Sequence, residues 1–121
     1  MELHDIHKSH NVNALLYHIV FPVKYRRKVL QFEQIDTCIK DTCKEIGERY
    51  EIIFHEIGAD IDHIHFLVQS VPKMSPTQIV TTIKSFTARE VFKEYEQTIK
   101  QFLWKQELWS DGYYIATVSS K

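Results

Sequence analysis

The sequence predicts an α+β fold in which helices pack on one face of an antiparallel four-stranded sheet. Four short runs alternate apolar and polar side chains, as half-buried strands do, and two longer runs place apolar residues at helical spacing. They follow the order strand, helix, strand, strand, helix, strand, with an extra helical stretch before the last strand. We expect residues 1–121 to form a single domain, because this length suits one hydrophobic core.

The composition is that of an ordinary globular protein, with 44% hydrophobic and 26% charged residues. No apolar run approaches the ~20 residues of a membrane span, and residues 1–12 are polar, unlike a signal peptide. We therefore expect a cytoplasmic protein without a membrane partner. We expect the N-terminal histidines, His4, His7 and His10, to lie in a solvated terminus. The two cysteines, Cys38 and Cys43, match no zinc or redox spacing, and we expect both thiols to be buried.

The first half of the chain predicts a strand, a helix and a second strand. Alternating large apolar side chains indicate a strand within residues 14–26. Pro22 should end it, bulge it or place it at an edge, because proline has no N–H to donate. Apolar residues at helical spacing predict a helix over about residues 32–49, whose last turn Gly47 weakens. The run YEIIFHEIG then indicates the second strand.

The second half predicts a third strand in HIHFLVQSV, reached through a hairpin loop at residues 58–62. Ser75, Pro76 and Gln78 form a helix start, because the serine can cap, the proline suits the first turn and the glutamine can complete a capping box. This helix should run to about Tyr95, followed by a helical segment over roughly residues 96–107 and a last strand, YYIATV. The order βαββαβ is that of the ferredoxin-like fold, which leaves one face of the sheet free of helices.

The third strand carries two histidines two positions apart. His63 and His65 should lie on the open face, because the period of two sends the apolar residues between them toward the helices. Two imidazoles on one face can converge on a divalent metal ion or a phosphate, and they can equally be ordinary surface histidines. Asp60 and Asp62 are metal ligands, partners of ligands or turn residues, and for Asp62 we expect a turn residue.

Four blocks of sequence resemble the small single-tyrosine transposases of bacterial insertion sequences of the IS200 type. They are YHIVFPVKYRRKVL, DHIHFLVQ, IKSFTARE and LWSDGYYIATV, in that order, and the resemblance extends from about His10 to Val118. These enzymes belong to the HUH nucleases, named for a His–hydrophobe–His motif that Ile64 and its flanking histidines match. Four ordered blocks make the resemblance more specific than the short motif alone.

The resemblance implies metal-dependent cutting and rejoining of single-stranded DNA at the hairpin ends of a mobile element. His63 and His65 would be the ligands of Mg²⁺ or Mn²⁺, which polarises the scissile phosphate. A tyrosine attacks the phosphorus and leaves a 5′-phosphotyrosine link that conserves bond energy for rejoining. Members of the family are homodimers whose sheets join, and each active site combines the histidines of one subunit with the tyrosine of the other.

The nucleophile is the departure from the family pattern. In the family it lies on a helix after the last strand, in a Tyr-Ile-x-x-Gln segment whose glutamine completes the metal site, whereas this chain stops at Lys121. Tyr113 and Tyr114 precede that place, and we expect them to be strand aromatics in the core or a dimer interface. We assign no catalytic tyrosine and expect no cleavage by this chain. The alternative function is a domesticated or truncated protein that binds DNA hairpins without cutting them. An RNA-binding module ranks below both, because the paired strand aromatics it needs do not appear.

The resemblance also gives a role to basic residues, although the formal net charge of −1 does not by itself indicate a nucleic-acid partner. The family contacts DNA just after the first strand, and the second helix can add contacts to phosphates. The candidates are Lys24, Arg26 and Arg27, with Lys84 and Arg89 as secondary contacts. Trp104 and Trp109 can stack on bases, but we expect packing to bury both.

Overall fold

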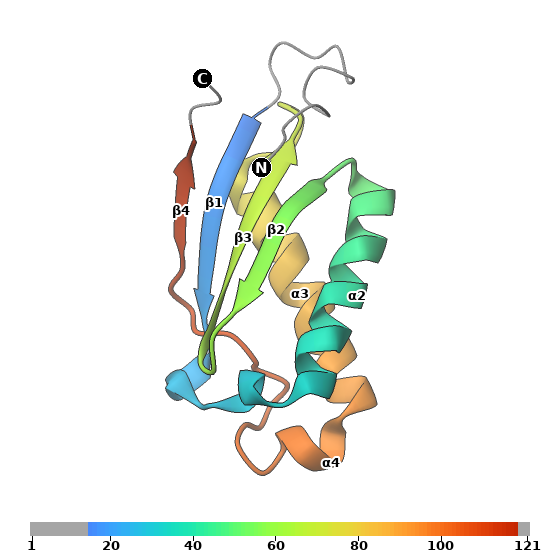
Figure 1. Cartoon of the computed structure of the whole chain (residues 1–121), viewed down its shortest axis with the longest axis vertical. Coiled ribbons are helices and arrows are strands. Elements are labelled where there is room, and N and C mark those ends of the chain that lie inside the picture. The colour runs from blue at the N-terminus through green and yellow to red at the C-terminus, as the bar shows by residue number, and fades with distance from the viewer. Residues whose placement is uncertain (1–14, 119–121) are drawn as a thin grey trace.

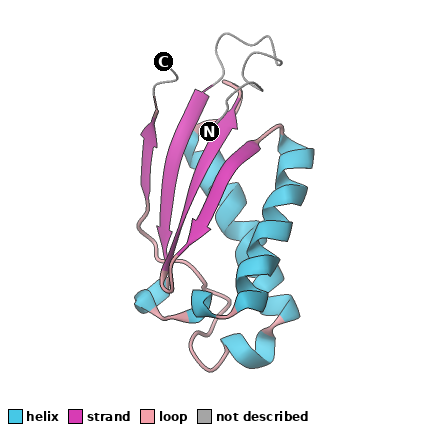
Figure 2. Cartoon of the chain, in the orientation of Figure 1, coloured by secondary structure: helices cyan, strands magenta, loops and turns pink. Residues whose placement is uncertain are grey.

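The computed structural model describes residues 15–118. Its four strands form one antiparallel sheet in the order β2-β3-β1-β4, and they span Leu15–Pro22 (β1), Ile53–Ala59 (β2), His63–Ser70 (β3) and Tyr114–Thr117 (β4). Helices α2 (Glu33–Tyr50) and α3 (Pro76–Glu94) cover one face of the sheet (Figures 1 and 2). The predicted ferredoxin-like fold is therefore confirmed. The predictions for His4, His7 and His10 fall outside the described residues.

Three shorter elements lie around this frame. Two 3₁₀ turns, η1 (Lys24–Arg26) and η2 (Val29–Gln31), follow β1, and α4 (Glu96–Ile99) follows α3. The predicted helical segment 96–107 is thus too long, since the chain beyond Ile99 runs through turns in which Lys105 and Gln106 take left-handed φ angles of 62° and 54°. No helix in residues 15–118 is long and apolar enough to cross a membrane.

The core lies between the sheet and its two helices. Ile64, Phe66 and Val68 on β3 are fully buried, and the ring of Phe66 meets that of Phe21 edge to face with centroids 5.2 Å apart. Burying side chains of this size contributes roughly 1.5–3 kcal/mol each. The helices bury a matching row of isoleucines, Ile35, Ile39, Ile79 and Ile83. The alternation in the sequence therefore predicted the core face of the sheet correctly.

The start of α3 follows its predicted local motif. The Ser75 hydroxyl accepts a hydrogen bond from the backbone N–H of Gln78 at 3.1 Å. The Gln78 side-chain oxygen accepts one from the backbone N–H of Ser75 at 2.8 Å, which completes the capping box. Pro76 is the first helical residue, as expected.

Strand β2 is irregular and lies close to α2. Its pairing with β3 shifts register between Phe54 and Glu56, so Phe54 and Ile57, three positions apart, both pack against the core. A Cβ on Gly47 would lie 2.8 Å from the carbonyl oxygen of Ile52. The glycine therefore lets the chain entering β2 approach the helix closely. From the sequence we expected only that Gly47 weakens the last turn of the helix.

The two cysteines differ in their surroundings. Cys43 is buried, and this burial raises the pKa of its thiol to about 12, so the thiolate does not form near neutral pH. Cys38 is only partly buried. The prediction that both thiols are buried is correct for Cys43 and wrong for Cys38, which lies nearer the edge of the apolar face of α2.

Trp109 ties the segment before β4 to α3. Its buried indole N–H donates to the Thr87 hydroxyl at 2.9 Å, and that hydroxyl donates to the carbonyl oxygen of Ile83 at 2.6 Å. The indole ring also packs on Phe21, with centroids 5.4 Å apart. The prediction that packing buries Trp109 is confirmed.

Replacing Thr87 by valine should destabilise the protein, because the buried indole N–H of Trp109 would lose its acceptor. We expect the free energy of unfolding to fall by about 1–3 kcal/mol, measured by urea denaturation. Thr81→Val, at an exposed position of the same helix, is the matched control. Equal stability of the two variants would contradict this account of the hydrogen bond.

Candidate functional site

The two histidines of β3 lie on the face of the sheet opposite the helices. Ile64 and Phe66, which alternate with them, are fully buried in the core, whereas His63 and His65 are partly exposed. The predicted orientation is confirmed. Gln69 shares this face but is buried, and its side-chain oxygen lies 2.9 Å from Nε2 of His55 on β2.

Asp62 holds His63 and also binds Arg26. Nδ1 of His63 and Nη2 of Arg26 lie 3.0 Å and 3.1 Å from the same carboxylate oxygen, Oδ1 of Asp62. The hydrogen bond with His63, together with that from Arg26, lowers the pKa of the Asp62 carboxyl. An Nδ1–H that donates to a carboxylate leaves Nε2 of the same ring free to bind a metal ion. Asp62 lies in the bend between β2 and β3, as expected of a turn residue, and its side chain also binds Arg26, 36 positions away in the sequence.

The hairpin loop before β3 is fixed on both sides. The side chain of Asp60 accepts a hydrogen bond from the N–H of Ile61 at 2.8 Å, a local contact that is typical of a turn residue. The backbone N–H of Val23 donates to the carbonyl oxygen of Asp62 at 2.9 Å, which joins the loop to the end of β1. These contacts place Arg26 beside His63 through backbone structure as well as through the ion pair.

His65 packs over a glycine and beside a third histidine. A Cβ on Gly58, its partner on β2, would lie 2.8 Å from Cε1 of His65 and closer still to Nε2. The His18 ring on β1 meets the His65 ring edge to face, with centroids 5.9 Å apart, and the ring of Tyr114 on β4 lies 6.2 Å from that of His18. Gly58 therefore makes the space that the imidazole of His65 occupies.

The histidine pair offers part of a metal site. In residues 15–118 no group of three or more His, Cys, Asp or Glu side chains is arranged to hold a metal ion. Neutral imidazole is a common ligand of divalent metal ions, Mg²⁺ and Mn²⁺ favour oxygen ligands beside it, and a carboxylate on the far ring nitrogen is the usual support of such a histidine. His63 and His65 thus fit two positions of a coordination sphere whose remaining positions need other donors, such as water or phosphate oxygens.

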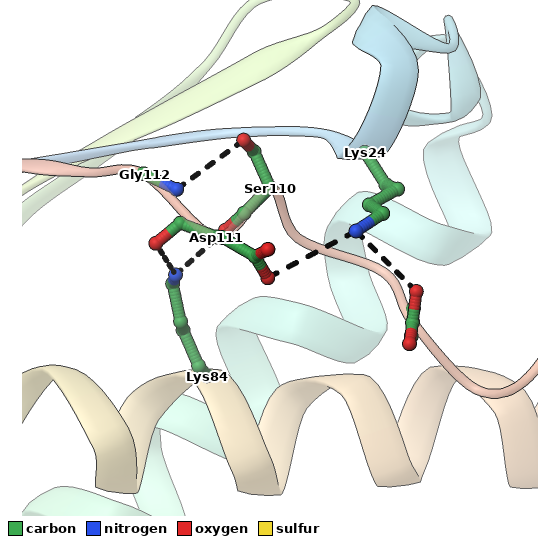
Figure 3. Close-up of polar contacts among 6 residues, drawn as sticks. Lys24, Lys84, Ser110, Asp111 and Gly112 are labelled. Carbon is green, nitrogen blue, oxygen red and sulfur yellow. Dashed lines mark hydrogen bonds and ion pairs between the residues drawn. The ribbon is translucent and has the colours of Figure 1, made fainter.

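The basic candidates have different surroundings. Lys24 pairs with Glu107 at 3.4 Å and with Asp111 at 3.9 Å (Figure 3). The amine of Lys84 donates to the backbone carbonyl oxygens of Ser110, at 2.7 Å, and Asp111, at 3.3 Å (Figure 3). Its partial burial lowers its pKa. Lys84 therefore fixes the segment that leads into β4 with two of its three N–H donors.

Arg89 does not lie near the histidines. Its guanidinium stacks on Phe86 of the same helix, 4.7 Å from the ring centroid, and Arg49 of α2 stacks on the same ring at 5.5 Å. Both arginines belong to the helix layer, whereas His63 and His65 lie on the open face of the sheet. Of the five basic candidates, Arg26 is the one that the described contacts link to the histidine pair, through Asp62.

Three aromatic residues that we expected to be packed are exposed. Trp104 is 52% exposed, and Tyr113 and Tyr114 are 43% and 56% exposed. Tyr114 projects from the open face of an edge strand, where the described chain offers no layer to cover it. Trp104 lies in the turns beyond α4 rather than on a helix packed against the core. Packing in the core is therefore wrong for Trp104, and of the two places expected for Tyr113 and Tyr114, the core or a dimer interface, the core is excluded.

The sequence model of the family described as "Transposase IS200 like" matches residues 11–121. The chain belongs to this family. Over 110 residues it is 36% identical to the ISDra2 transposase TnpA of Deinococcus radiodurans, an alignment that covers 89% of this chain and 76% of the relative. Over 102 residues it is 29% identical to the IS200 transposase of Salmonella typhimurium, covering 84% of this chain and 66%, about two thirds, of the relative.

A solved structure of a transposase from Deinococcus radiodurans has the same fold. It superposes with a TM-score of 0.77 at 28% sequence identity, and the match covers 90% of this chain and 82% of the other. The family resemblance expected from the four sequence blocks is therefore confirmed over nearly the whole chain. The chain is a transposase of the IS200-like family, a class of enzymes that act on DNA.

Replacing Gly58 by alanine should displace the His65 ring, because the added methyl group overlaps the imidazole. We expect a shift of the His65 ring signals in the NMR spectrum and a loss of about 1–3 kcal/mol of stability. Gly112→Ala is the matched control, since a Cβ there meets nothing within 4 Å. Unchanged His65 signals in the Gly58 variant would refute the close approach.

Proposed function

We propose that this transposase chain is the core of a strand transferase that cuts and rejoins single-stranded DNA at hairpin ends, with a divalent metal ion and a 5′-phosphotyrosine intermediate. The observation that carries the proposal is the open-face histidine pair, in which Asp62 supports His63 and Gly58 makes room for His65. The family membership supports the DNA substrate and the transposition reaction.

His63 and His65 would hold the metal ion, through Nε2 of His63 and a ring nitrogen of His65. When bound there, Mg²⁺ or Mn²⁺ polarises the scissile phosphate and stabilises the leaving 3′-oxygen. Asp62 keeps the hydrogen of His63 on Nδ1, which leaves Nε2 as the donor of an electron pair. Arg26 neutralises this carboxylate with one of its N–H groups, and its other N–H groups remain suited to a DNA phosphate next to the metal.

The attacking tyrosine would come from the segment that follows β4. Tyr114 lies on the same face as the histidines, but its ring is next to His18 rather than next to His63. Residues 115–121 contain no tyrosine. In the family pattern, a helix after the last strand carries the tyrosine nucleophile and the glutamine that completes the metal site. Such a helix would follow β4 here.

A homodimer is part of this proposal. β2 and β4 are the two edges of the described sheet, and an edge strand presents unpaired N–H and C=O groups to a partner. Two copies joined through their sheets would bring the segment after β4 of one subunit to the histidines of the other.

The second candidate function is hairpin binding without cleavage. It is supported by η1 and the residue after it, where Lys24 and Arg27 lie beside the exposed ring of Tyr25 independently of any nucleophile. Formation of a covalent protein–DNA adduct distinguishes this candidate from the strand transferase.

Removing either histidine should abolish metal binding. We expect weak binding of Mn²⁺ by calorimetry, because the described residues supply only the histidine pair, and we expect His63→Ala and His65→Ala each to eliminate it. His55→Gln, a change on the neighbouring strand β2, is the control. If the variant that carries both histidine replacements bound Mn²⁺ as well as the unmodified protein does, the assignment of His63 and His65 as metal ligands would be wrong.

The 121-residue polypeptide should form no covalent adduct with a labelled single-stranded hairpin in the presence of Mn²⁺, because an in-line nucleophile is needed as well as a metal ion. A denaturing gel measures this. The same chain extended by a helix of the family's Tyr-Ile-x-x-Gln type should give a band that disappears when the added tyrosine is replaced by phenylalanine. A band from the 121-residue chain that is lost in Tyr114→Phe would instead place the nucleophile on β4.

A further inference from the structure

Tyr25 and Trp104 form an exposed, stacked aromatic pair. Their rings lie 5.8 Å apart at an interplanar angle of 27°, and their side chains are 61% and 52% exposed. The two residues come from segments far apart in the sequence, η1 and the turns beyond α4. Large aromatic rings are usually buried in the core or at interfaces, so an exposed stacked pair indicates a surface that receives a ligand.

A backbone hydrogen bond and two buried leucines fix the segments that carry the aromatic pair. The backbone N–H of Lys24 donates to the carbonyl oxygen of Leu108 at 2.9 Å, which joins the two segments. Leu103 and Leu108, which flank the turn that carries Trp104, are fully buried. A surface that orders its aromatic groups in advance loses less conformational entropy when a ligand binds.

The backbone of both segments is strained. Tyr25 and Arg26 have φ angles of 58° and 53°, and Lys105 and Gln106, next to Trp104, have φ angles of 62° and 54°. A residue other than glycine in this left-handed region costs roughly 1–2 kcal/mol. Four such residues around one aromatic pair indicate that the surrounding structure maintains this arrangement.

Two positive charges lie beside the Tyr25 ring, and one of them, Lys24, is also paired with Glu107 and Asp111. Nζ of Lys24 lies 5.5 Å and Cζ of Arg27 lies 5.9 Å from the centroid of the Tyr25 ring. The next residue, Arg26, contacts Asp62, whose carboxylate also holds His63. The aromatic surface is thus connected to the proposed metal site through one ion pair and one hydrogen bond.

Aromatic rings next to cations bind single-stranded nucleic acid, since the rings stack on an unpaired base while the cations neutralise the adjoining phosphates. We propose that Tyr25 and Trp104 form a stacking platform for an unpaired base of single-stranded DNA that flanks the hairpin. The proposal rests on the proposed function for its DNA substrate. The platform would be a subsite that prefers single-stranded over duplex DNA, because the bases of a duplex are already stacked on their neighbours.

The two tryptophans of the chain provide a direct measurement, since Trp104 is exposed and Trp109 is buried. The probes are a DNA hairpin with single-stranded flanks and the same hairpin without flanks. We expect the flanked hairpin to quench the tryptophan fluorescence and to bind more tightly than the blunt one. Trp104→Leu should lose the quenching and about 5- to 100-fold in affinity, while Trp104→Phe should retain most of the affinity.

The salt dependence separates stacking from charge. Trp104→Leu should leave the slope of log Kd against log salt concentration unchanged, whereas Arg27→Gln should flatten it by about one unit or less. A change of slope in Trp104→Leu would contradict a stacking role. Unfolding temperatures of the variants equal to that of the unmodified protein would exclude a loss of fold as the cause, since both side chains are exposed.

The failures of the two proposals are distinguishable. Absence of binding to either hairpin by the unmodified protein would overturn the proposed function itself. Tight binding of the flanked hairpin that Trp104→Leu leaves intact would overturn the platform alone. An RNA strand of the same sequence that binds more tightly, with the same dependence on Trp104, would show that the occupant is RNA and would overturn the assignment to DNA.

Discussion

The burial of the apolar face of β3 is the constraint on which the candidate site depends. Ile64, Phe66 and Val68 are fully enclosed by the helices, and a strand sends successive side chains to opposite faces. A slip of one residue in the pairing would send both histidines into the core and these apolar residues into water. The hydrophobic core thus fixes where His63 and His65 lie before any interaction between the histidines and a ligand takes place.

Local patterns predicted most of the fold, because they act over a few residues. The period of two in HIHFLVQSV and the Ser75–Gln78 capping box both depend on neighbours in the sequence, and both are correct in the structure. The helical segment after α3 was predicted too long because it carries the apolar residues Phe102, Leu103 and Trp104, although the chain beyond Ile99 runs through turns. Propensity is a weak guide where tertiary packing decides the backbone.

The support of the site could not be read from the sequence. Asp62 looked like a turn residue, and only the fold brings Arg26 to it across 36 positions. The stacking of Trp104 likewise involves Tyr25, which lies in a distant segment of the sequence. The signal that was present is Gly58, since a glycine opposite a histidine on a neighbouring strand indicates close approach of a side chain. Lys84 was misleading, because a lysine on an exposed helix gives no sign that backbone carbonyl groups will hold its amine.

The irregularity of β2 makes the two borders of the sheet unequal. Its register shift between Phe54 and Glu56 breaks the regular spacing of backbone groups along that border, whereas the pairing of β1 with β4 runs without a shift from Tyr17 to Val20. A strand from another molecule would therefore find a regular row of donors and acceptors at β4 and an interrupted one at β2. In the described part of the chain, the edge at β4, where the polypeptide leaves the sheet, is thus the more regular of the two edges, although it is only four residues long.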